Sequence, residues 1–168
     1  MKSVELFTGA GVLARGTASF GFQHEAVVEW DRNACDTIRF NQQRGLPLLA
    51  GWRVFEQDVN EFDYSAVSGD VSLLAAGPPC QPFSLAGKHR GEDDRRDMFP
   101  AVFEAVRNLR PRAVLVENVK GLLRQSFAEY FEYIVLQLTY PELRREDDED
   151  WRDHLSRLEQ HHTSAHQL

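Results

Sequence analysis

The chain has 168 residues, of which 42% are hydrophobic and 27% charged, and its formal net charge is −7; this is the composition of a soluble domain that can bury a core. No run approaches the roughly 20 apolar residues that span a bilayer, and the first residues lack the apolar core of a secretory signal, so we expect a cytoplasmic protein without membrane contact. Two cysteines exclude a disulfide framework and a cysteine metal cluster, and the negative charge argues against a general nucleic-acid coat without excluding a nucleic-acid substrate.

Short apolar runs alternate with helical patterns along the first 141 residues. Strands are predicted at 4–7, 25–30, 53–58, 71–76 and 113–118, and helices at 12–21, 32–41, 98–109 and 127–138. Asp31 and Asp97 are the expected N-caps of two of these helices. Such alternation is typical of βαβ units with right-handed crossovers. The predicted fold class is therefore α/β, an open and mainly parallel sheet with helices on both faces.

Residues 142–168 differ in character from the rest of the chain. They hold eight acidic residues and four arginines and contain no strand pattern. Trp151, Leu155 and Leu158 predict one face of a short helix, and the last eight residues, HHTSAHQL, read as a loose end. We therefore expect two parts, residues 1–141 as a ligand-binding α/β region and 142–168 as an acidic, helical or loose segment.

Glycines and titratable residues fall at the ends of the predicted strands. In chain order they are Gly9 and Gly11, Glu29, Asp58, Cys80 and Glu117. The carboxyl ends of parallel strands share one edge of the sheet, where ligands bind in open α/β folds. Five separate segments therefore point to one site.

Each of these residues also has a plain structural interpretation. The Gly9–Gly11 turn is either ordinary structure or a place where the backbone approaches a ligand closely. Glu29 is either a solvated strand end or a carboxylate that holds ribose hydroxyls about 20 residues after the glycines. Trp30 suits the core or a ligand platform, and Asp58 suits a turn. We expect Cys35 to be a packed helix thiol.

Cys80 lies in the stretch GPPCQPFS, directly after the fourth predicted strand. The commonest fate of a free cysteine is burial in a core. Here three prolines brace the loop that carries the thiol, and Glu117 ends the neighbouring strand. A thiol beside an acid is typical of nucleophilic attack paired with proton donation.

These residues together resemble the catalytic domain of the cytosine-5 DNA methyltransferases, which use S-adenosyl-L-methionine. The similarity covers about residues 4–123. The matching stretches, in the order of the family, are ELFTGAGVLARG, VVEWDRNACDTIRFN, QDV, GPPCQPFS, EDDRRDMF and VLVENVKGLL. The resemblance implies a Rossmann-like methyltransferase sheet and methyl transfer to C5 of cytosine in DNA, within a restriction–modification system.

The resemblance also implies roles for single residues. The Cys80 thiolate would attack C6 of a cytosine flipped out of double-stranded DNA, and Glu117 would contact N3 and the exocyclic amine. The implied cofactor-binding residues are Phe7, Gly9, Gly11, Glu29, Trp30, Asp58, Val59, Pro78 and Met98. The implied substrate-binding residues are Ser84, Lys88, Arg90, Arg95 and Asn118, of which the basic ones suit phosphate contact.

Departures from the family pattern are of two kinds. Glu5, Val12 and Ser72 replace an aspartate, a glycine and an aspartate that are common there. The family's later arginine motif, its target-recognition region and its closing Asn-Val motif are not in these 168 residues. We therefore expect the N-terminal part of a longer enzyme, incomplete at its C-terminal side and inactive alone. The alternatives are a subunit completed by a second polypeptide, a non-catalytic remnant, and a tRNA cytosine-5 methyltransferase.

Overall fold

The computed structural model describes residues 1–79 and 97–165, and these divide into two compact units. The first unit comprises Met1–Pro79 and Pro100–Asn118. The described part of the second unit comprises residues 97–99 and 119–165. The first unit holds a β-sheet, and the second holds the last two helices of the chain.

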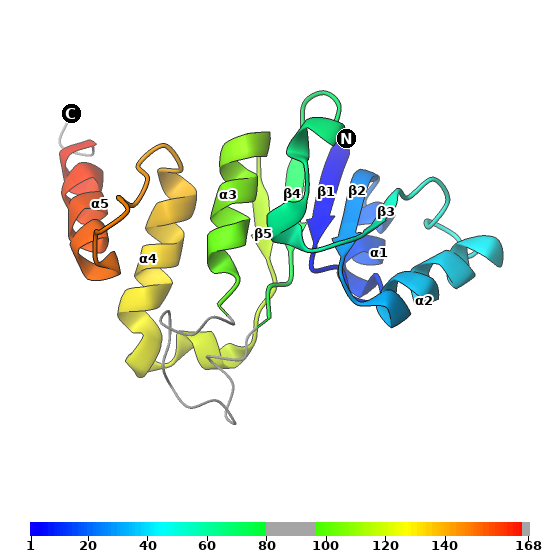
Figure 1. The fold of residues 1–168 in the computed structure, drawn as a ribbon, viewed down its shortest axis with the longest axis horizontal. Coiled ribbons are helices and arrows are strands. Elements are labelled where there is room, and N and C mark those ends of the chain that lie inside the picture. Colours follow the sequence, from blue (N-terminus) through cyan, green and yellow to red (C-terminus); the bar gives the residue numbers. More distant parts are fainter. Residues whose placement is uncertain (80–96, 166–168) are drawn as a thin grey trace. The chain divides into compact units, whose positions relative to one another are not determined.

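The first unit is built on a five-stranded sheet in the order β3-β2-β1-β4-β5 (Figure 1). Its strands are β1 (Lys2–Leu6), β2 (Gln23–Glu29), β3 (Val54–Glu56), β4 (Leu73–Ala76) and β5 (Val114–Val116). All four neighbouring pairs are parallel. The prediction of an open parallel α/β fold is confirmed, although β3 and β5 are shorter than the sequence pattern indicated.

Three helices connect the strands: α1 (Val12–Ser19), α2 (Arg32–Gln43) and α3 (Phe99–Leu109). The chain moves from β1 outward to β3 in one direction and from β4 to β5 in the other. Right-handed crossovers therefore place α1 and α2 on one face of the sheet and α3 on the other. The predicted N-cap at Asp31 is confirmed, because its side chain accepts from the amide of Ala34. Helix α3 begins at Phe99, so Asp97 lies one residue before the cap position, and its side chain accepts from the amide of Phe99.

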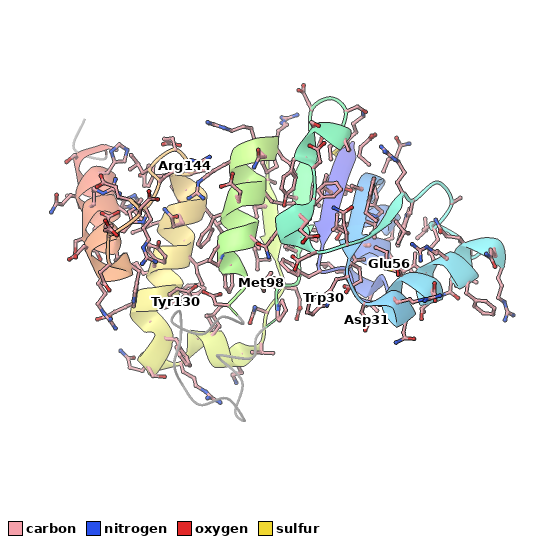
Figure 2. All side chains as sticks on the ribbon, viewed as in Figure 1. Trp30, Asp31, Glu56, Met98, Tyr130 and Arg144 are labelled. Atoms are coloured by element: carbon pink, nitrogen blue, oxygen red, sulfur yellow. The ribbon has the colours of Figure 1, made fainter. Side chains whose placement is uncertain are left out.

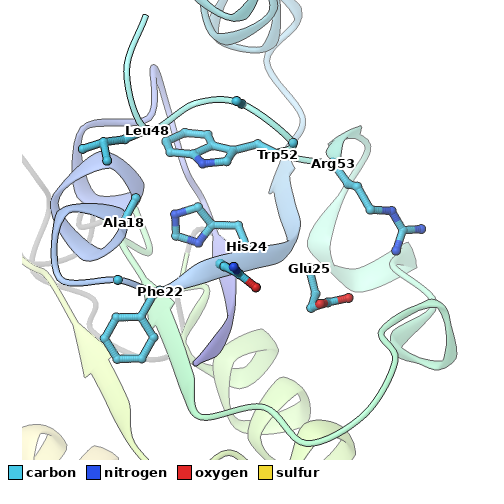
Figure 3. A pocket seen from close by; sticks show the side chains of 11 residues that line it. Ala18, Phe22, His24, Glu25, Leu48, Trp52 and Arg53 are labelled. Atoms are coloured by element: carbon cyan, nitrogen blue, oxygen red, sulfur yellow. The ribbon is translucent and has the colours of Figure 1, made fainter.

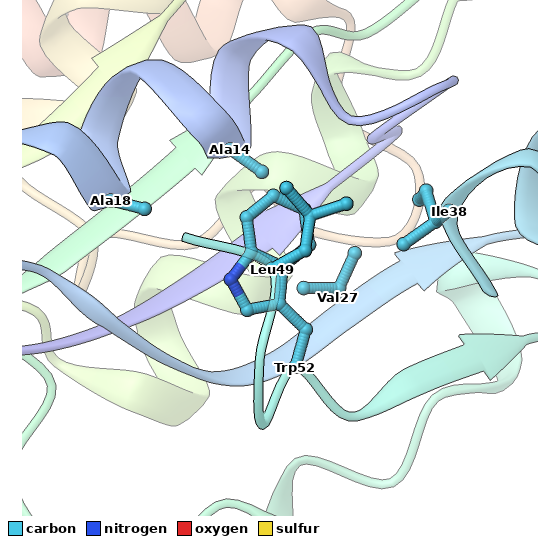
Figure 4. Close-up of a cluster of buried hydrophobic side chains, with 6 residues drawn as sticks. All are labelled: Ala14, Ala18, Val27, Ile38, Leu49 and Trp52. Atoms are coloured by element: carbon cyan, nitrogen blue, oxygen red, sulfur yellow. The ribbon is translucent and has the colours of Figure 1, made fainter. Parts of the chain in front are cut away.

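The central strands are buried on both faces, as the apolar run at 71–76 predicted. All four residues of β4 and four of the five residues of β1 are buried. On one side of the sheet a cluster of hydrophobic side chains joins α1, β2, α2 and the loop before β3 (Figure 4): Ala14, Ala18, Val27, Ile38, Leu49 and Trp52. Gln42 fixes this loop by donating to the carbonyls of Leu49 and Trp52, both at 3.0 Å.

A small polar group is buried between β1, α1 and β2. Glu5 is 1% exposed, and its Oε1 atom accepts a 2.5 Å hydrogen bond from Thr17 Oγ1. His24 Nε2 donates to the carbonyl of Ala14 at 2.8 Å, so the neutral ring accepts at Nδ1 from Ser3 Oγ at 2.6 Å. Burial raises the pKa of Glu5 to about 7, against the smaller opposing effect of the Thr17 hydrogen bond, and burial lowers the pKa of His24. The interior therefore favours the neutral form of both groups.

The second unit packs α4 (Ala128–Thr139) against α5 (Trp151–Ala165). Tyr130 and Tyr133 of α4 both contact the Trp151 ring, with centroids 5.6 Å apart in each case. Tyr133 Oη lies 3.1 Å from His154 Nδ1, while His154 Nε2 lies 3.0 Å from the carbonyl of Leu143, to which it donates. Polar and aromatic contacts thus join the two helices across the acidic segment between them.

The expected loose end at residues 161–168 is wrong for the part that the structure describes. Helix α5 continues through His161 and His162 to Ala165. Tyr140, the residue after α4, explains the extension. Its hydroxyl lies 2.8 Å from His162 Nδ1, and its ring contacts that of His161 edge-on at 4.8 Å. Because polar contacts of this kind produce no repeat of apolar residues in the sequence, the sequence pattern predicted a shorter helix than the structure shows.

We predict that Glu5→Gln makes the fold less sensitive to alkaline pH. The raised pKa of Glu5 means that its proton stabilises the folded state below the ordinary carboxyl pKa, and that this contribution is lost as pH rises through about 7. The glutamine side chain of the variant stays neutral and can still accept from Thr17. Urea unfolding should show that the free energy of unfolding of the variant, relative to the wild type, increases between pH 5 and pH 8 by at most about 3 kcal/mol.

The matched control for this prediction is Glu25→Gln on the same sheet. Glu25 pairs with Lys2 at 3.1 Å near the surface, so its exchange should give no comparable pH-dependent difference. A stability difference between Glu5→Gln and the wild type that is the same at both pH values would contradict a proton on Glu5.

Candidate functional site

Backbone hydrogen bonds continue between neighbouring segments just beyond the carboxyl ends of the strands. Four backbone hydrogen bonds extend the ladders, with N···O distances of 3.3, 3.2, 3.0 and 2.9 Å; they join Thr8 to Val28, Gly77 to Leu6, Gln57 to Glu29 and Glu117 to Ala76. The strand order reverses between β1 and β4, the place where open α/β sheets form their ligand crevice. The segments after β1 and β4 therefore lie at this switch point.

Residues that follow three different strands lie close together at Gly77. A Cβ atom built on Gly77 would lie 3.6 Å from Glu117 Oε2 and 3.6 Å from the carbonyl oxygen of Phe7. The ends of β1, β4 and β5 thus meet around one residue, and the carboxylate of Glu117 lies beside the start of the segment that leads to Cys80. The absence of a side chain at Gly77 keeps this place open.

The turn after β1 depends on left-handed backbone. Phe7, Gly9 and Gly11 have φ angles of 54°, 56° and 89°. A Cβ on Gly9 would meet nothing within 4 Å, whereas one on Gly11 would lie 3.2 Å from Trp52 Cζ3 and 3.4 Å from Ile38 Cγ1. Trp52 and Ile38 therefore form a floor beneath the turn. Sequence reasoning missed this role, because nothing in the pattern around Trp52 links it to Gly11.

Glu29 fastens the same turn. Its side chain is 7% exposed; Oε2 accepts from the Gly9 amide at 2.7 Å and Oε1 accepts from the Asp31 amide at 2.8 Å. One carboxylate thus connects the Gly9 turn, the end of β2 and the residue that caps α2. Each carboxylate oxygen retains a further lone pair, so each can accept another hydrogen bond.

The segments after β2 and β3 present one exposed ring and one carboxylate. Trp30 is 74% exposed and lies beside Asp31 at the end of β2 (Figure 2). Asp58 Oδ1 accepts from the amide and the side chain of Asn60 at 2.8 and 2.9 Å, and among the described residues Oδ2 has no partner. Val59 is buried and begins the short 3-10 turn Val59–Glu61. An aromatic face and an acceptor are the groups that an adenine ring requires.

Asn118 holds the backbone that leads toward Cys80. Its Nδ2 atom donates to the carbonyl oxygen of Pro78 at 3.2 Å, two residues before the cysteine. Met98 belongs to the second unit. The predicted residues Cys80, Ser84, Lys88, Arg90 and Arg95 lie outside the described residues.

Cys35 is the packed thiol that the sequence predicted. It is fully buried, its Sγ atom donates to the carbonyl of Glu29 at 3.3 Å, and burial raises the pKa of its thiol to about 11. A thiol in this state is a poor nucleophile. Within residues 1–79 and 97–165, no three His, Cys, Asp or Glu side chains are grouped to hold a metal ion. No helix in the same part of the chain is long and apolar enough to cross a membrane.

The fold and the Gly9 turn define a Rossmann-like α/β protein with its ligand edge at the switch point. The family model for C-5 cytosine-specific DNA methylases matches residues 1–140. The chain therefore belongs to the C-5 cytosine-specific DNA methylase family.

Curated relatives agree with this membership. The Type II methyltransferase M.NgoMIV of Neisseria gonorrhoeae is 41% identical over 135 residues, which cover 80% of this chain and 41% of the relative. The Type II methyltransferase M.PspPI of Psychrobacter sp. strain TA137 is 43% identical over 135 residues, which cover 79% of this chain and 30% of the relative. The chain thus spans less than half the length of these relatives.

Solved structures share the fold. A protein of E. coli whose structure is titled as a DNA modification methyltransferase encoded within a prophage is similar with a TM-score of 0.63 and 23% identity, over 83% of this chain and 38% of that one. A DNMT2 variant from Spodoptera frugiperda is similar with a TM-score of 0.55 and 20% identity, over 82% and 41%. At this identity the likeness extends to the fold alone.

We predict that Gly11→Ala destabilises the first unit more than Gly45→Ala does. Both glycines have positive φ angles, 89° and 69°, so an alanine at either position costs of order 1–3 kcal/mol of backbone strain. Only at position 11 does the new methyl group also press on Trp52 and Ile38, whereas Gly45 has open space around it. Urea unfolding should show an extra loss of about 1–3 kcal/mol for Gly11→Ala. Equal losses at the two positions would show that the floor beneath Gly11 yields without cost.

Proposed function

We propose that this chain supplies the cofactor site and the nucleophile of an enzyme that transfers a methyl group from S-adenosyl-L-methionine to C5 of cytosine in double-stranded DNA. The observation that carries the proposal is the meeting of β1, β4 and β5 at Gly77, which brings the Gly9 turn, Glu117 and the segment before Cys80 to one edge. Family membership and the Type II methyltransferase names of the curated relatives support DNA, in a restriction–modification system, over a tRNA substrate.

The described residues fit the cofactor. Phe7, Gly9 and Gly11 would shape the pocket for its methionine side, where Gly9 has open space around it. Glu29 would accept the ribose hydroxyls, and Trp30 would offer its exposed face to the adenine. The remaining proposed contacts within the first unit are Asp58 and Val59 at the adenine and Pro78 at the wall. S-adenosyl-L-methionine, when bound, supplies a methyl group as an electrophile.

The protein's own residues would activate the cytosine. The Cys80 thiolate adds to C6 of the flipped base, and Glu117 holds the proton that neutralises N3 as the S–C6 bond forms. Electron density then moves to C5, which is too poor a nucleophile before this addition. After methyl transfer, loss of the C5 proton expels the thiolate and restores the aromatic ring. Asn118 would keep the backbone before Cys80 in place through Pro78.

Activity would require segments that these 168 residues do not contain. The resemblance implies a further arginine at the cytosine and a target-recognition region on the other side of the duplex. Base flipping costs a few kcal/mol of unstacking, and a net charge of −7 gives no general attraction to phosphate. We propose that a polypeptide with these motifs completes the enzyme, while Ser84, Lys88, Arg90 and Arg95 contact DNA from this chain.

The catalytic assignment predicts that Cys80→Ser abolishes methylation. Transfer of tritiated methyl groups to duplex DNA should be absent with this chain alone and should arise when a polypeptide with the missing motifs is added. Because groups that act as a unit lose nearly all activity when one is removed, Cys80→Ser should return incorporation to background.

Cys35→Ala is the matched control for the nucleophile. Its thiol is buried in the core and donates to the carbonyl of Glu29, so incorporation should persist in this variant. Strong Cys80-dependent incorporation by the 168-residue chain alone would refute the need for a partner. Incorporation that survives Cys80→Ser in the completed enzyme would refute the nucleophile.

A second prediction concerns cofactor affinity. S-adenosyl-L-methionine should bind this chain weakly, because the family's closing motif, which completes the cofactor fold, is not among its residues. Calorimetry should detect little heat with the chain alone and a stronger, Glu29-dependent signal with the completing polypeptide. Tight Glu29-dependent binding to the 168-residue chain would contradict the incomplete site.

A further inference from the structure

Trp52 belongs to the loop before β3, but its side chain lies beneath the turn that the proposed cofactor would contact. Its Cζ3 atom lies 3.2 Å from the position of a Cβ on Gly11, and Ile38 Cγ1 lies 3.4 Å from the same position. Gly11 begins α1, because its amide donates to the carbonyl of Thr8 at 3.0 Å and its carbonyl accepts from Arg15 at 2.9 Å. The position of the turn therefore depends on the ring beneath Gly11.

His24 supports the indole from the side. The two rings meet edge-on, with centroids 4.7 Å apart and planes at 84° (Figure 3). His24 is buried; its Nε2 atom donates to the carbonyl of Ala14 at 2.8 Å, and its Nδ1 atom accepts from Ser3 Oγ at 2.6 Å. These two hydrogen bonds fix the plane of the imidazole, so the surface that meets Trp52 is held in one orientation.

The loop that carries Trp52 is fixed separately. Gln42 of α2 donates to the carbonyls of Leu49 and Trp52, both at 3.0 Å. Trp52 and His24 also line a pocket of about 520 Å³, together with residues at the end of α1 and the start of β2 (Figure 3). Because this side of the indole is not filled by packing, the contact with His24 and the hydrogen bonds of Gln42 hold the ring against the turn.

The turn above the indole also carries the contact to Glu29. The Gly9 amide donates to Glu29 Oε2 at 2.7 Å, and Gly9 and Gly11 both have left-handed backbone within this turn. A ring that withdraws from Gly11 leaves a space into which the turn can move. Such a movement changes how the Gly9 amide approaches the carboxylate. One side chain beneath the turn thus governs two groups assigned to the cofactor.

We propose that Trp52 is a positioning residue for S-adenosyl-L-methionine, and that His24 holds it in this role. The indole acts through the turn and not by contact with the cofactor. It keeps Gly9 and the Glu29 carboxylate at the spacing that the methionine and ribose ends of the cofactor require. The inference rests on the cofactor site of the proposed function, whereas the support of the turn is a property of the first unit alone.

The test is nuclear magnetic resonance of the ¹⁵N-labelled 168-residue chain, first alone and then with millimolar S-adenosyl-L-methionine, at which weak binding is measurable. Trp52→Phe lacks the fused benzene ring that reaches Gly11. The Gly9 and Gly11 amide signals should therefore shift, and the Gly9 amide should exchange faster with solvent. The Glu29-dependent affinity for the cofactor should fall at least about threefold. His24→Gln removes the supporting ring and should shift the same two amides.

Leu49→Ala is the matched control. It truncates a buried side chain of the same loop and the same hydrophobic cluster, whereas the atoms nearest to Gly11 belong to Trp52 and Ile38. Urea unfolding should show a loss of stability in both Leu49→Ala and Trp52→Phe. Leu49→Ala should nevertheless keep the Gly9 signal and the cofactor affinity of the wild type, because a merely structural role changes the stability alone.

Gly11→Ala replaces Trp52→Phe if the latter fails to fold. Its new methyl group should shift the Trp52 indole N–H signal, whereas Gly45→Ala, with open space around it, should not. Unchanged Gly9 and Gly11 signals in Trp52→Phe, or an affinity equal to that of the wild type, would overturn the proposal. If the wild type shows no Glu29-dependent binding while Trp52→Phe still shifts the Gly9 signal, the proposed cofactor site is refuted and the support of the turn stands.

Discussion

The carboxylate of Glu29 is the contact on which the ligand edge of this sheet depends. Its two oxygens accept from the amides of Gly9 and Asp31, so one side chain joins the turn after β1 to the start of α2. Gly9 adopts a φ angle of 56°, and the hydrogen bond to Glu29 holds its amide in that conformation. A residue at the end of one strand thus shapes the turn that follows its neighbour, and a ligand that contacts Glu29 meets a carboxylate already fixed in orientation.

Much of this arrangement could be predicted from the sequence, for a physical reason. Apolar runs alternate with helical periodicity, and parallel strands bring their carboxyl ends to one edge, so Glu29, Asp58 and Glu117 were placed by counting strands. The floor beneath Gly11 could not be predicted, because Trp52 lies in a loop where tertiary packing alone decides its neighbours. The burial of Glu29 and the full length of α5 were missed because both depend on hydrogen bonds between distant residues, which leave no periodic signal.

The second unit contains residues that lie within the family match and residues that follow it. The family match ends at residue 140, at the end of α4, whereas α5 begins at Trp151. Contacts of Tyr130 and Tyr133 with Trp151 bind the later helix to the earlier one. A hydrogen bond that Tyr130 donates to Asp97 also joins α4 to the residues just before Phe99. The C-terminal helix is therefore an integral part of this unit and not a detached extension.

The reactivity of the buried Cys35 thiol can be used to measure local opening of the first unit. A thiol that is fully buried and whose pKa burial has raised to about 11 reacts with an alkylating reagent only after the surrounding segment separates from the sheet. The thiol lies one turn into α2 and donates to the last carbonyl of β2, next to the Glu29 contact. The rate at which the reagent modifies Cys35 in native buffer therefore measures how often α2 separates from β2. This local opening has its own free energy, which is distinct from the free energy of global unfolding.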